Sequence, residues 1–320
     1  MKMLYLQPNY SHYRGASYQR DLPEALNKLH TILAYGPGIP NYNPEHRIAD
    51  VLALFTETPD LICYGAGWEW DGNDEAFDFQ PSLNPVDCGI PTVMILNREY
   101  KKMEMKFDFI REKGILHIFT SHHFCASWQE KLGIPFTWFP FAADPAVFRD
   151  YGEPIQFDFG FSGNLHENYI NIRARIRDKL QDKKFRHLHQ FWGVAKNMQT
   201  GKAYARMINR ARIWLSTPSA VDLVGPRFYE IMACGTLLFC PRSPVYMDLF
   251  KDGIDCVMFE PDLSDFDERL LYYSMHEEER AVIAERGKIN ALTCHTWDER
   301  ARYFTQVTTA LLNEEHSRSC

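Results

Sequence analysis

The chain has 320 residues, a length that suits two α/β domains of about 150 residues each, and 45% hydrophobic and 24% charged residues are typical of a soluble globular protein. Its 35 Lys and Arg residues stand against 42 Asp and Glu residues, so the formal charge of −7 argues against a basic nucleic-acid surface, and nucleic acid is not an expected partner. No apolar run reaches the roughly 18 residues of a transmembrane helix, and the eight Cys form no Cys-x-x-Cys pair; we therefore expect a cytoplasmic protein with reduced thiols and without a transmembrane segment.

The first half of the chain alternates short apolar runs, typical of strands, with amphipathic stretches, typical of helices. The expected strands are residues 3–7, 31–35, 60–64, 91–96, 117–120 and 136–139. The expected helices are residues 18–29, 44–55, 103–113 and 126–132. This alternation predicts a parallel sheet with helices on both faces, and such sheets bind ligands beyond the carboxyl ends of their strands.

The second half repeats the pattern. Its expected strands are residues 158–162, 186–192, 213–216, 236–240 and 256–259, and its expected helices are residues 168–180, 202–209, 228–233, 263–274, 277–290 and 298–313. Between the halves, Pro140, Pro145, Gly152 and Pro154 interrupt both periodicities. We therefore predict two α/β domains, residues 1–150 and 151–296, with a hinge near residue 150 and a small-molecule cleft between them.

The most informative segment is residues 222–236, DLVGPRFYEIMACGT. A turn at Gly225 and Pro226 opens a short helix, whose first backbone N–H groups favour an anion, and Arg227 adds a cation beside them. Glu230 lies one turn further on, where its carboxylate can accept two hydrogen bonds from a ribose diol. The alternative interpretation is an ordinary capped helix with an exposed Arg and Glu.

A second candidate is the turn formed by Ser162, Gly163 and Asn164 at the end of a predicted strand. Gly163 permits a positive φ and a close approach of the backbone to a phosphate, and Arg173 follows on the next helix. An ordinary strand-to-helix turn remains the alternative. The segment is not a Walker loop, because no Gly-Lys-Ser/Thr sequence occurs in the chain.

Two polar turns follow strands of the first half. Tyr13, Arg14 and Gly15 come after the first strand, which is the expected place for a ligand-binding loop. His122 and His123 end another strand in the same way, either as residues of the binding cleft or as polar surface residues. Adjacent histidines point in different directions, so they do not form a good metal site.

Glu99 closes a further strand, where it can act as a base, contact the substrate or simply begin the next helix. One Asp-x-Asp tripeptide, Asp265 to Asp267, opens a polar helix late in the chain, where Asp is favoured near the helix N-terminus. We interpret it as part of that helix start, and no metal is expected.

Several segments together resemble GT-B glycosyltransferases of the CgeB-like and glycosyltransferase family 4-like group. Residues 227–235, RFYEIMACG, are similar to the family's R-x-x-E-x-x-A-C/A-G signature. The family's other motifs match in the same order along the chain, at residues 139–148 (FPFAADPAVF), 157–164 (FDFGFSGN) and 295–300 (HTWDER). The resemblance covers residues 117–304 well, whereas the first hundred residues resemble the family only in their alternation of strands and helices.

The resemblance implies two Rossmann-like domains that face each other across a cleft, with the donor on the C-terminal domain and the acceptor on the N-terminal one. It implies that Glu230 holds the donor ribose and that residues 225–227 and 163–164 contact the diphosphate. Retaining relatives carry an acid eight positions before this Glu; here it is Asp222, one methylene shorter, which leaves the stereochemistry open. The resemblance further implies that residues 297–320 form a helix that crosses back to the N-terminal domain.

The leading hypothesis is therefore a glycosyltransferase of class EC 2.4 that uses a nucleotide-diphosphate sugar, without a metal or other cofactor. The acceptor, a glycan, lipid-linked glycan, protein or small molecule, is not identified by the sequence, and neither is the oligomeric state. Two alternatives remain open. One is a catalytically silent protein that binds sugars or nucleotides, and the other is a nucleotide-sugar epimerase.

Overall fold

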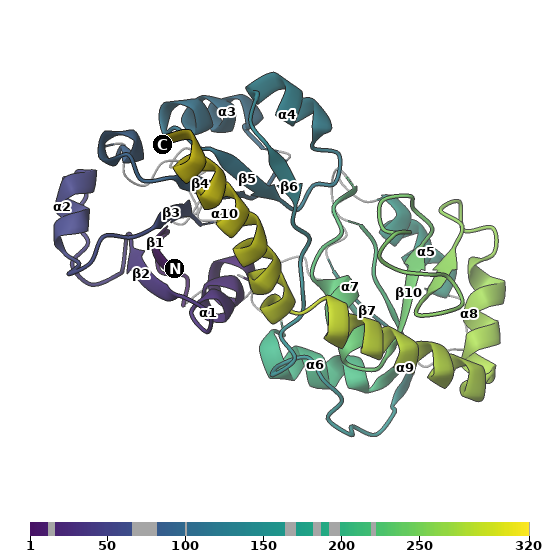
Figure 1. The fold of residues 1–320 in the computed structure, drawn as a ribbon. Helices are drawn as coiled ribbons and strands as arrows, with labels where there is room; N and C mark the ends of the chain where they lie inside the picture. Colours follow the sequence, from purple (N-terminus) through teal and green to yellow (C-terminus); the bar gives the residue numbers. More distant parts are fainter. Residues whose placement is uncertain are drawn as a thin grey trace. The chain divides into compact units, whose positions relative to one another are not determined.

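A computed structural model of the protein describes residues 1–11, 17–65, 82–99, 101–163, 171–181, 187–191, 199–218 and 222–319. The chain divides into two compact units (Figure 1). Unit 1 comprises Met1–Pro140 and Trp297–Cys320, and unit 2 comprises Phe141–Thr296. Among the described residues, no helix combines the length and the apolar character needed to cross a membrane.

Unit 1 contains a parallel sheet of six described strands in the order β2-β1-β3-β4-β5-β6. The strands are β1 (Lys2–Leu6), β2 (Thr31–Tyr35), β3 (Leu61–Tyr64), β4 (Thr92–Leu96), β5 (His117–Thr120) and β6 (Phe136–Trp138). All residues of β3, β4 and β5 are buried, as expected for parallel strands covered on both faces. The strand order changes direction between β1 and β3, and such switch points of parallel sheets are where ligands bind.

The helices of unit 1 are α1 (Leu22–Leu26), α2 (Ile48–Ala53), α3 (Met103–Glu112), α4 (Ala126–Leu132) and α10 (Trp297–Ser319), with a 3₁₀ turn at Pro85–Cys88. The helix expected at residues 18–29 is instead a π-helical turn, Ser17–Asp21, followed by α1. Pro23 stands in the first turn of α1, where a missing N–H is tolerated, whereas inside a longer helix it would remove a hydrogen bond.

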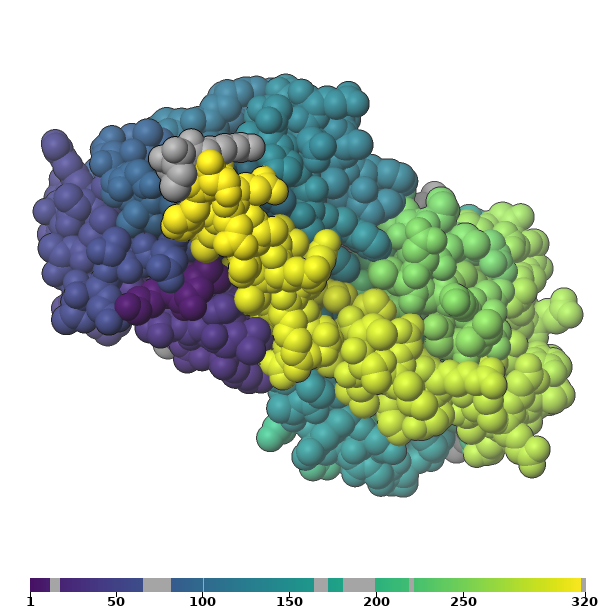
Figure 2. Space-filling model, viewed as in Figure 1, coloured from purple at the N-terminus to yellow at the C-terminus, as the bar shows by residue number. Residues whose placement is uncertain are grey.

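Helix α10 belongs to unit 1 although it ends the chain, and Figure 2 shows it lying on the surface of that unit. Phe304 of α10 packs against Phe119 of β5, with 4.5 Å between ring centroids. Arg300 donates a hydrogen bond of 2.8 Å to the carbonyl of Pro140, the last residue of the first segment of unit 1. These contacts bury one side of α10 against the sheet.

Unit 2 contains a parallel sheet of five described strands in the order β11-β10-β9-β7-β8. The strands are β7 (Phe157–Gly163), β8 (His187–Phe191), β9 (Ala211–Leu215), β10 (Leu237–Pro241) and β11 (Val257–Phe259). The helices are α5 (Asn171–Gln181), α6 (Gly201–Asn209), α7 (Arg227–Ala233), α8 (Phe266–Met275) and α9 (Glu277–Cys294). The order repeats that of unit 1, and the switch point lies between β7 and β9.

The core of unit 2 has two layers, one on each face of its sheet. Helices α6 and α7 pack on the face that carries Trp214 and Leu238, and α5 and α8 pack on the face that carries Phe159 and Phe239. Gly160 lies beneath Trp214; a Cβ there would come within 2.2 Å of the indole ring, so only glycine fits. Helices on both faces of a parallel sheet make each unit a doubly wound α/β structure.

The segment after Pro140 belongs to unit 2. Phe148 is buried in its core, and the backbone N–H of Tyr151 donates a hydrogen bond of 2.7 Å to Asn209 of α6. The boundary between the units therefore lies at Pro140, whereas the prolines and glycine of this segment led the sequence analysis to place it near residue 150.

Candidate functional site

Strand β7 of unit 2 ends at two of the predicted site residues, Ser162 and Gly163. Ser162 is buried and donates a hydrogen bond of 2.8 Å to the hydroxyl of Tyr204 on α6. Gly163 has no positive φ. A Cβ there would lie 2.7 Å from the ring of Phe161 and 3.1 Å from Arg173, so glycine is required for space and not for a left-handed backbone, which corrects one of the two reasons given from the sequence.

Arg173 of α5 lies beside this turn. It is 6% exposed, donates a hydrogen bond of 2.7 Å to the hydroxyl of Thr217 just beyond β9, and lies over the ring of Phe161. Its guanidinium therefore connects the carboxyl ends of β7 and β9, the two strands of the switch point.

Arg227 of α7 interacts with Arg173 and with Tyr204 of α6. Burial, and to a smaller extent the positive charge of Arg227, lower the pKa of Arg173 to about 9. Burial also raises the pKa of the Tyr204 hydroxyl; Arg227 opposes this increase and Glu230 adds to it. Arg173, Tyr204, Arg227 and Glu230 thus interact electrostatically although they come from three helices. Two guanidinium groups held close together in a poorly solvated place favour the binding of an anion.

The start of α7 leaves room beside this cluster. A Cβ on Gly225 would meet no atom within 4 Å, and Pro226 is the N-cap residue. Glu230 is half-buried on the first turn. Asp222 is exposed and has a φ of 57°, a conformation that costs free energy for a residue other than glycine.

In unit 1, the predicted residues of β4 and β5 lie together at the carboxyl edge of the sheet. Glu99 is buried, and its Oε1 accepts hydrogen bonds of 2.8 Å from the Thr120 hydroxyl, 2.9 Å from the Ser121 backbone and 2.8 Å from the Ser121 hydroxyl. The alternative in which Glu99 merely begins α3 is wrong, because α3 begins at Met103.

His122 and His123 follow β5. His122 is 9% exposed, its Nδ1 accepts a hydrogen bond from the backbone of Phe124, and its ring lies 4.9 Å from that of Trp128. His123 is half-buried, and its ring centroid lies 3.6 Å from that of Phe124. His122 is therefore a buried, oriented imidazole rather than a polar surface residue.

Four predicted residues, Tyr13, Arg14, Gly15 and Asn164, lie outside the described residues. The structure brings together Ser162, Gly163, Arg173, Arg227 and Glu230 in unit 2, and Glu99 with the turn before His122 in unit 1.

Sequence reasoning missed Tyr204, Thr217 and Lys106. Tyr204 lies on a helix whose apolar face is buried in the core, so its hydroxyl gave no signal of its own. Thr217 comes just after a predicted strand, and that position was the available clue. Lys106 is a buried lysine in the amphipathic helix α3, and no pattern in the sequence distinguishes it from an exposed one.

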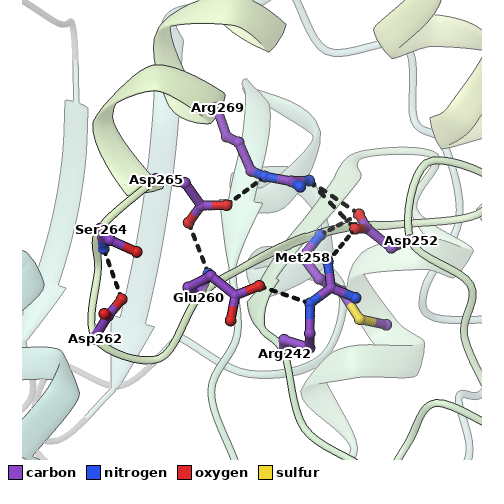
Figure 3. A network of polar contacts seen from close by, with 8 residues as sticks. All are labelled: Arg242, Asp252, Met258, Glu260, Asp262, Ser264, Asp265 and Arg269. Carbon is purple, nitrogen blue, oxygen red and sulfur yellow. Dashed lines mark hydrogen bonds and ion pairs between the residues drawn. The ribbon is translucent and has the colours of Figure 1, made fainter.

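Asp265, the first residue of the Asp-x-Asp tripeptide, lies in a network of ion pairs at the carboxyl ends of β10 and β11 (Figure 3). Asp265 accepts hydrogen bonds from the backbone of Glu260, at 2.7 Å, and from Arg269, at 2.6 Å, while Arg269 also pairs with Asp252. Phe266, between the two Asp residues, is fully buried. Among the described residues, no three His, Cys, Asp or Glu side chains are grouped to hold a metal ion.

Residues 173–306 match the family model described as glycosyl transferase-like. Comparison with curated proteins gives no match. Among solved structures, sucrose-phosphate synthase from Thermosynechococcus elongatus is similar over 98% of this chain and 100% of that chain, with 14% identity and a TM-score of 0.58.

HepE from Anabaena in complex with UDP-glucose is similar over 97% of this chain and 100% of that chain, with 11% identity and a TM-score of 0.60. A glycosyltransferase from Rickettsia africae is similar over 97% of this chain and 98% of that chain, with 12% identity and a TM-score of 0.58. These likenesses confirm the predicted fold class, two Rossmann-like parallel sheets of the kind found in GT-B glycosyltransferases. Membership of the CgeB-like group stays a prediction.

Proposed function

We propose that the protein is a glycosyltransferase that moves a sugar from a nucleotide-diphosphate sugar to an acceptor hydroxyl. The observation that carries this proposal is the cluster at the switch point of unit 2, where Arg173 and Arg227 lie close together beside Gly163. The match of residues 173–306 to the glycosyl transferase-like model supports it, because that segment contains the two arginines and Glu230. The similarity to HepE, which was solved with UDP-glucose, agrees with a nucleotide-sugar donor.

In this proposal each side chain of the cluster has a separate task. Arg173 and Arg227 hold the diphosphate and stabilise the negative charge that develops on it as the leaving group. Residues 225–227, at the start of α7, and the Ser162–Gly163 turn contact the phosphates through the backbone. Glu230 accepts hydrogen bonds from the donor ribose, and Asp222 contacts the transferred sugar. Because two guanidinium groups neutralise the diphosphate, the transfer is proposed to be metal-independent.

The acceptor is proposed to bind unit 1, where Glu99, His122 and His123 lie at the carboxyl edge of the sheet. The stereochemistry depends on whether Asp222 takes the place of the longer acid of retaining enzymes. Product analysis by NMR, which reads the anomeric configuration directly, distinguishes retention from inversion.

Nucleotide binding tests the proposal most directly. Calorimetry with UDP, GDP, dTDP, CDP and ADP should identify one nucleotide that binds the wild type and binds Arg173→Lys at least about tenfold more weakly. Arg177→Lys is the matched control, because Arg177 lies on the same helix but pairs with Asp178 at the surface. Failure of all five nucleotides to bind the wild type, or equal affinity of both variants, would contradict the proposal.

Turnover separates the alternatives. Incubation of the corresponding nucleotide sugar with EDTA present should still release free nucleotide, by transfer or slow hydrolysis. Binding without any release of nucleotide would indicate a catalytically silent binding protein. Conversion of the nucleotide sugar into its epimer would indicate an epimerase.

A further inference from the structure

One carboxylate oxygen in the loop after β4 holds the turn that follows β5. Oε1 of Glu99 is within 2.9 Å of the Ser121 backbone nitrogen and within 2.8 Å of the Ser121 and Thr120 hydroxyls. Each of these three groups donates to the same oxygen. Hydrogen bonds to an ionised acceptor are stronger than those between neutral groups, so this buried carboxylate fixes the turn firmly.

The turn at Thr120 and Ser121 also orients His122. The hydroxyl of Thr120, which donates to Glu99, accepts a hydrogen bond of 3.2 Å from the backbone N–H of His122. The backbone N–H of Phe124 donates to Nδ1 of the same ring, also at 3.2 Å. Because Nδ1 accepts a hydrogen bond, the neutral imidazole carries its proton on Nε2. The carboxylate is thus connected to His122 through a single hydroxyl.

The loop that carries Glu99 is fixed from its own side as well. Nζ of Lys106 is buried and donates to the carbonyls of Asn97, at 2.6 Å, and Arg98, at 2.8 Å. Arg98 has a φ of 49°, an unfavourable conformation that these bonds maintain. Glu99 therefore projects from a loop that is itself anchored to α3.

The burial of Glu99 argues against direct contact with substrate. The residue is 4% exposed, and its second oxygen, Oε2, is buried without a hydrogen-bond donor among the described residues. A general base has to reach the proton that it removes, whereas one oxygen of Glu99 accepts three hydrogen bonds and the other is buried. We propose that Glu99 is a positioning residue, which acts through Thr120 and Ser121 to hold His122 as a donor with its proton on Nε2. This role of Glu99 does not depend on the proposed function; only the identity of the group to which His122 donates rests on it.

The tautomer of His122 can be read without any substrate. In protein labelled with ¹⁵N-histidine, long-range ¹H–¹⁵N NMR distinguishes Nε2–H from Nδ1–H rings, and comparison with His122→Gln assigns the signal. At a pH where the ring is neutral, the wild type should show the Nε2–H form. Glu99→Gln should keep it, because the amide oxygen can still accept the three hydrogen bonds. Glu99→Ala should lose the single tautomer.

A second pair of variants covers the case in which Glu99→Ala does not fold. Thr120→Ser keeps the bridging hydroxyl and should preserve the Nε2–H signal, whereas the isosteric Thr120→Val removes the bridge and should lose it. Glu104→Gln, a surface carboxylate paired with Lys131, is the control and should change nothing. An unchanged tautomer in Thr120→Val would overturn the proposal, as would its loss in Glu99→Gln. Because no nucleotide is used, a failure of the proposed function would not alter these results.

Discussion

The hydroxyl of Ser162, at the end of β7, donates a hydrogen bond of 2.8 Å to the hydroxyl of Tyr204 on α6. This bond fixes the Tyr204 hydroxyl, whose proton can then be donated towards an acceptor. Because Arg227 and Glu230 both act electrostatically on Tyr204, the tyrosine connects the β7 turn to the proposed phosphate- and ribose-binding residues of α7. The site in unit 2 is therefore organised through a side chain that belongs to none of the recognised motifs.

Replacement of Tyr204 by phenylalanine tests that connection. The variant keeps the ring contacts of Tyr204 with Phe148 and Trp214 but leaves the buried Ser162 hydroxyl without its acceptor. The variant also lacks the hydroxyl that can donate to the nucleotide, and a hydrogen bond of that kind is worth about 0.5–1.5 kcal/mol, so affinity for the nucleotide should fall about threefold to tenfold. Calorimetry, with the nucleotide that binds the wild type in the five-nucleotide screen described above, measures this loss of affinity.

The control for this prediction is Tyr272→Phe. That hydroxyl also makes one hydrogen bond, of 2.8 Å to Glu279, but on the surface of helix α8. Its loss should leave nucleotide affinity unchanged. If Tyr204→Phe and Tyr272→Phe bind the nucleotide with equal affinity, the Tyr204 hydroxyl does not contribute to binding and the side chain serves packing alone.

Arg227→Lys should weaken the binding of the diphosphate. Lysine keeps the charge but loses the planar fork that binds two oxygens at once, so affinity for the nucleoside diphosphate should fall about tenfold. Affinity for the nucleoside without phosphates should not change. If both ligands lose affinity to the same extent, Arg227 acts on the fold of the site and not on the diphosphate.

Glu230→Ala should remove discrimination between ribose and 2′-deoxyribose. In the wild type, a hydrogen bond from the 2′-hydroxyl to the carboxylate should contribute roughly 1.5–3 kcal/mol, so the ribonucleotide should bind at least about tenfold more tightly than its 2′-deoxy form. In the variant the two affinities should be nearly equal. The assignment fails if the wild type itself binds both forms equally.

The fold could be predicted from the sequence because strands and helices alternate with clear periodicity. The expected strands at residues 31–35 and 117–120 match β2 and β5, and the other described strands differ from expectation by one or two residues at their ends. Hydrophobic patterning is clearest in the central strands β3, β4 and β5, whose residues are all buried, whereas β2 and β6 at the two edges of that sheet are only partly buried. The π-helical turn before α1 was missed because Pro23 divides a stretch that otherwise has helical spacing.

The site was harder to predict for a physical reason. Motifs identify residues close together in sequence, such as Arg227 and Glu230, whereas Tyr204 and Thr217 reach the cluster only through the strand order of the sheet. The interpretation of Glu99 shows the same limit. Its position after a strand indicated a role at the ligand edge, but the three donors that surround Oε1 come from a segment more than twenty residues later, which no local pattern records.

His117, at the start of β5, should make the stability of unit 1 depend on pH. Its ring is buried and lies 2.7 Å from the hydroxyl of Thr137 on β6, and burial lowers its pKa from 6.5 to about 4. Between these values the unfolded chain binds a proton that the folded protein does not. Stability therefore rises with pH in this window, is complete above 6.5, and is lost as the pH falls towards 4.

The magnitude can be checked with His117→Gln, whose amide can still bond to Thr137. At about pH 4.5 the histidine should cost the wild type about 2.5 kcal/mol of its stability at neutral pH, in addition to the loss that titrating carboxylates cause in both proteins. Urea denaturation at the two pH values should therefore show a smaller decrease in unfolding free energy for His117→Gln than for the wild type. His276→Gln, at an exposed histidine after α8, should behave as the wild type does. Equal pH dependence in wild type and His117→Gln would mean that His117 titrates in the folded protein as it does in the unfolded chain.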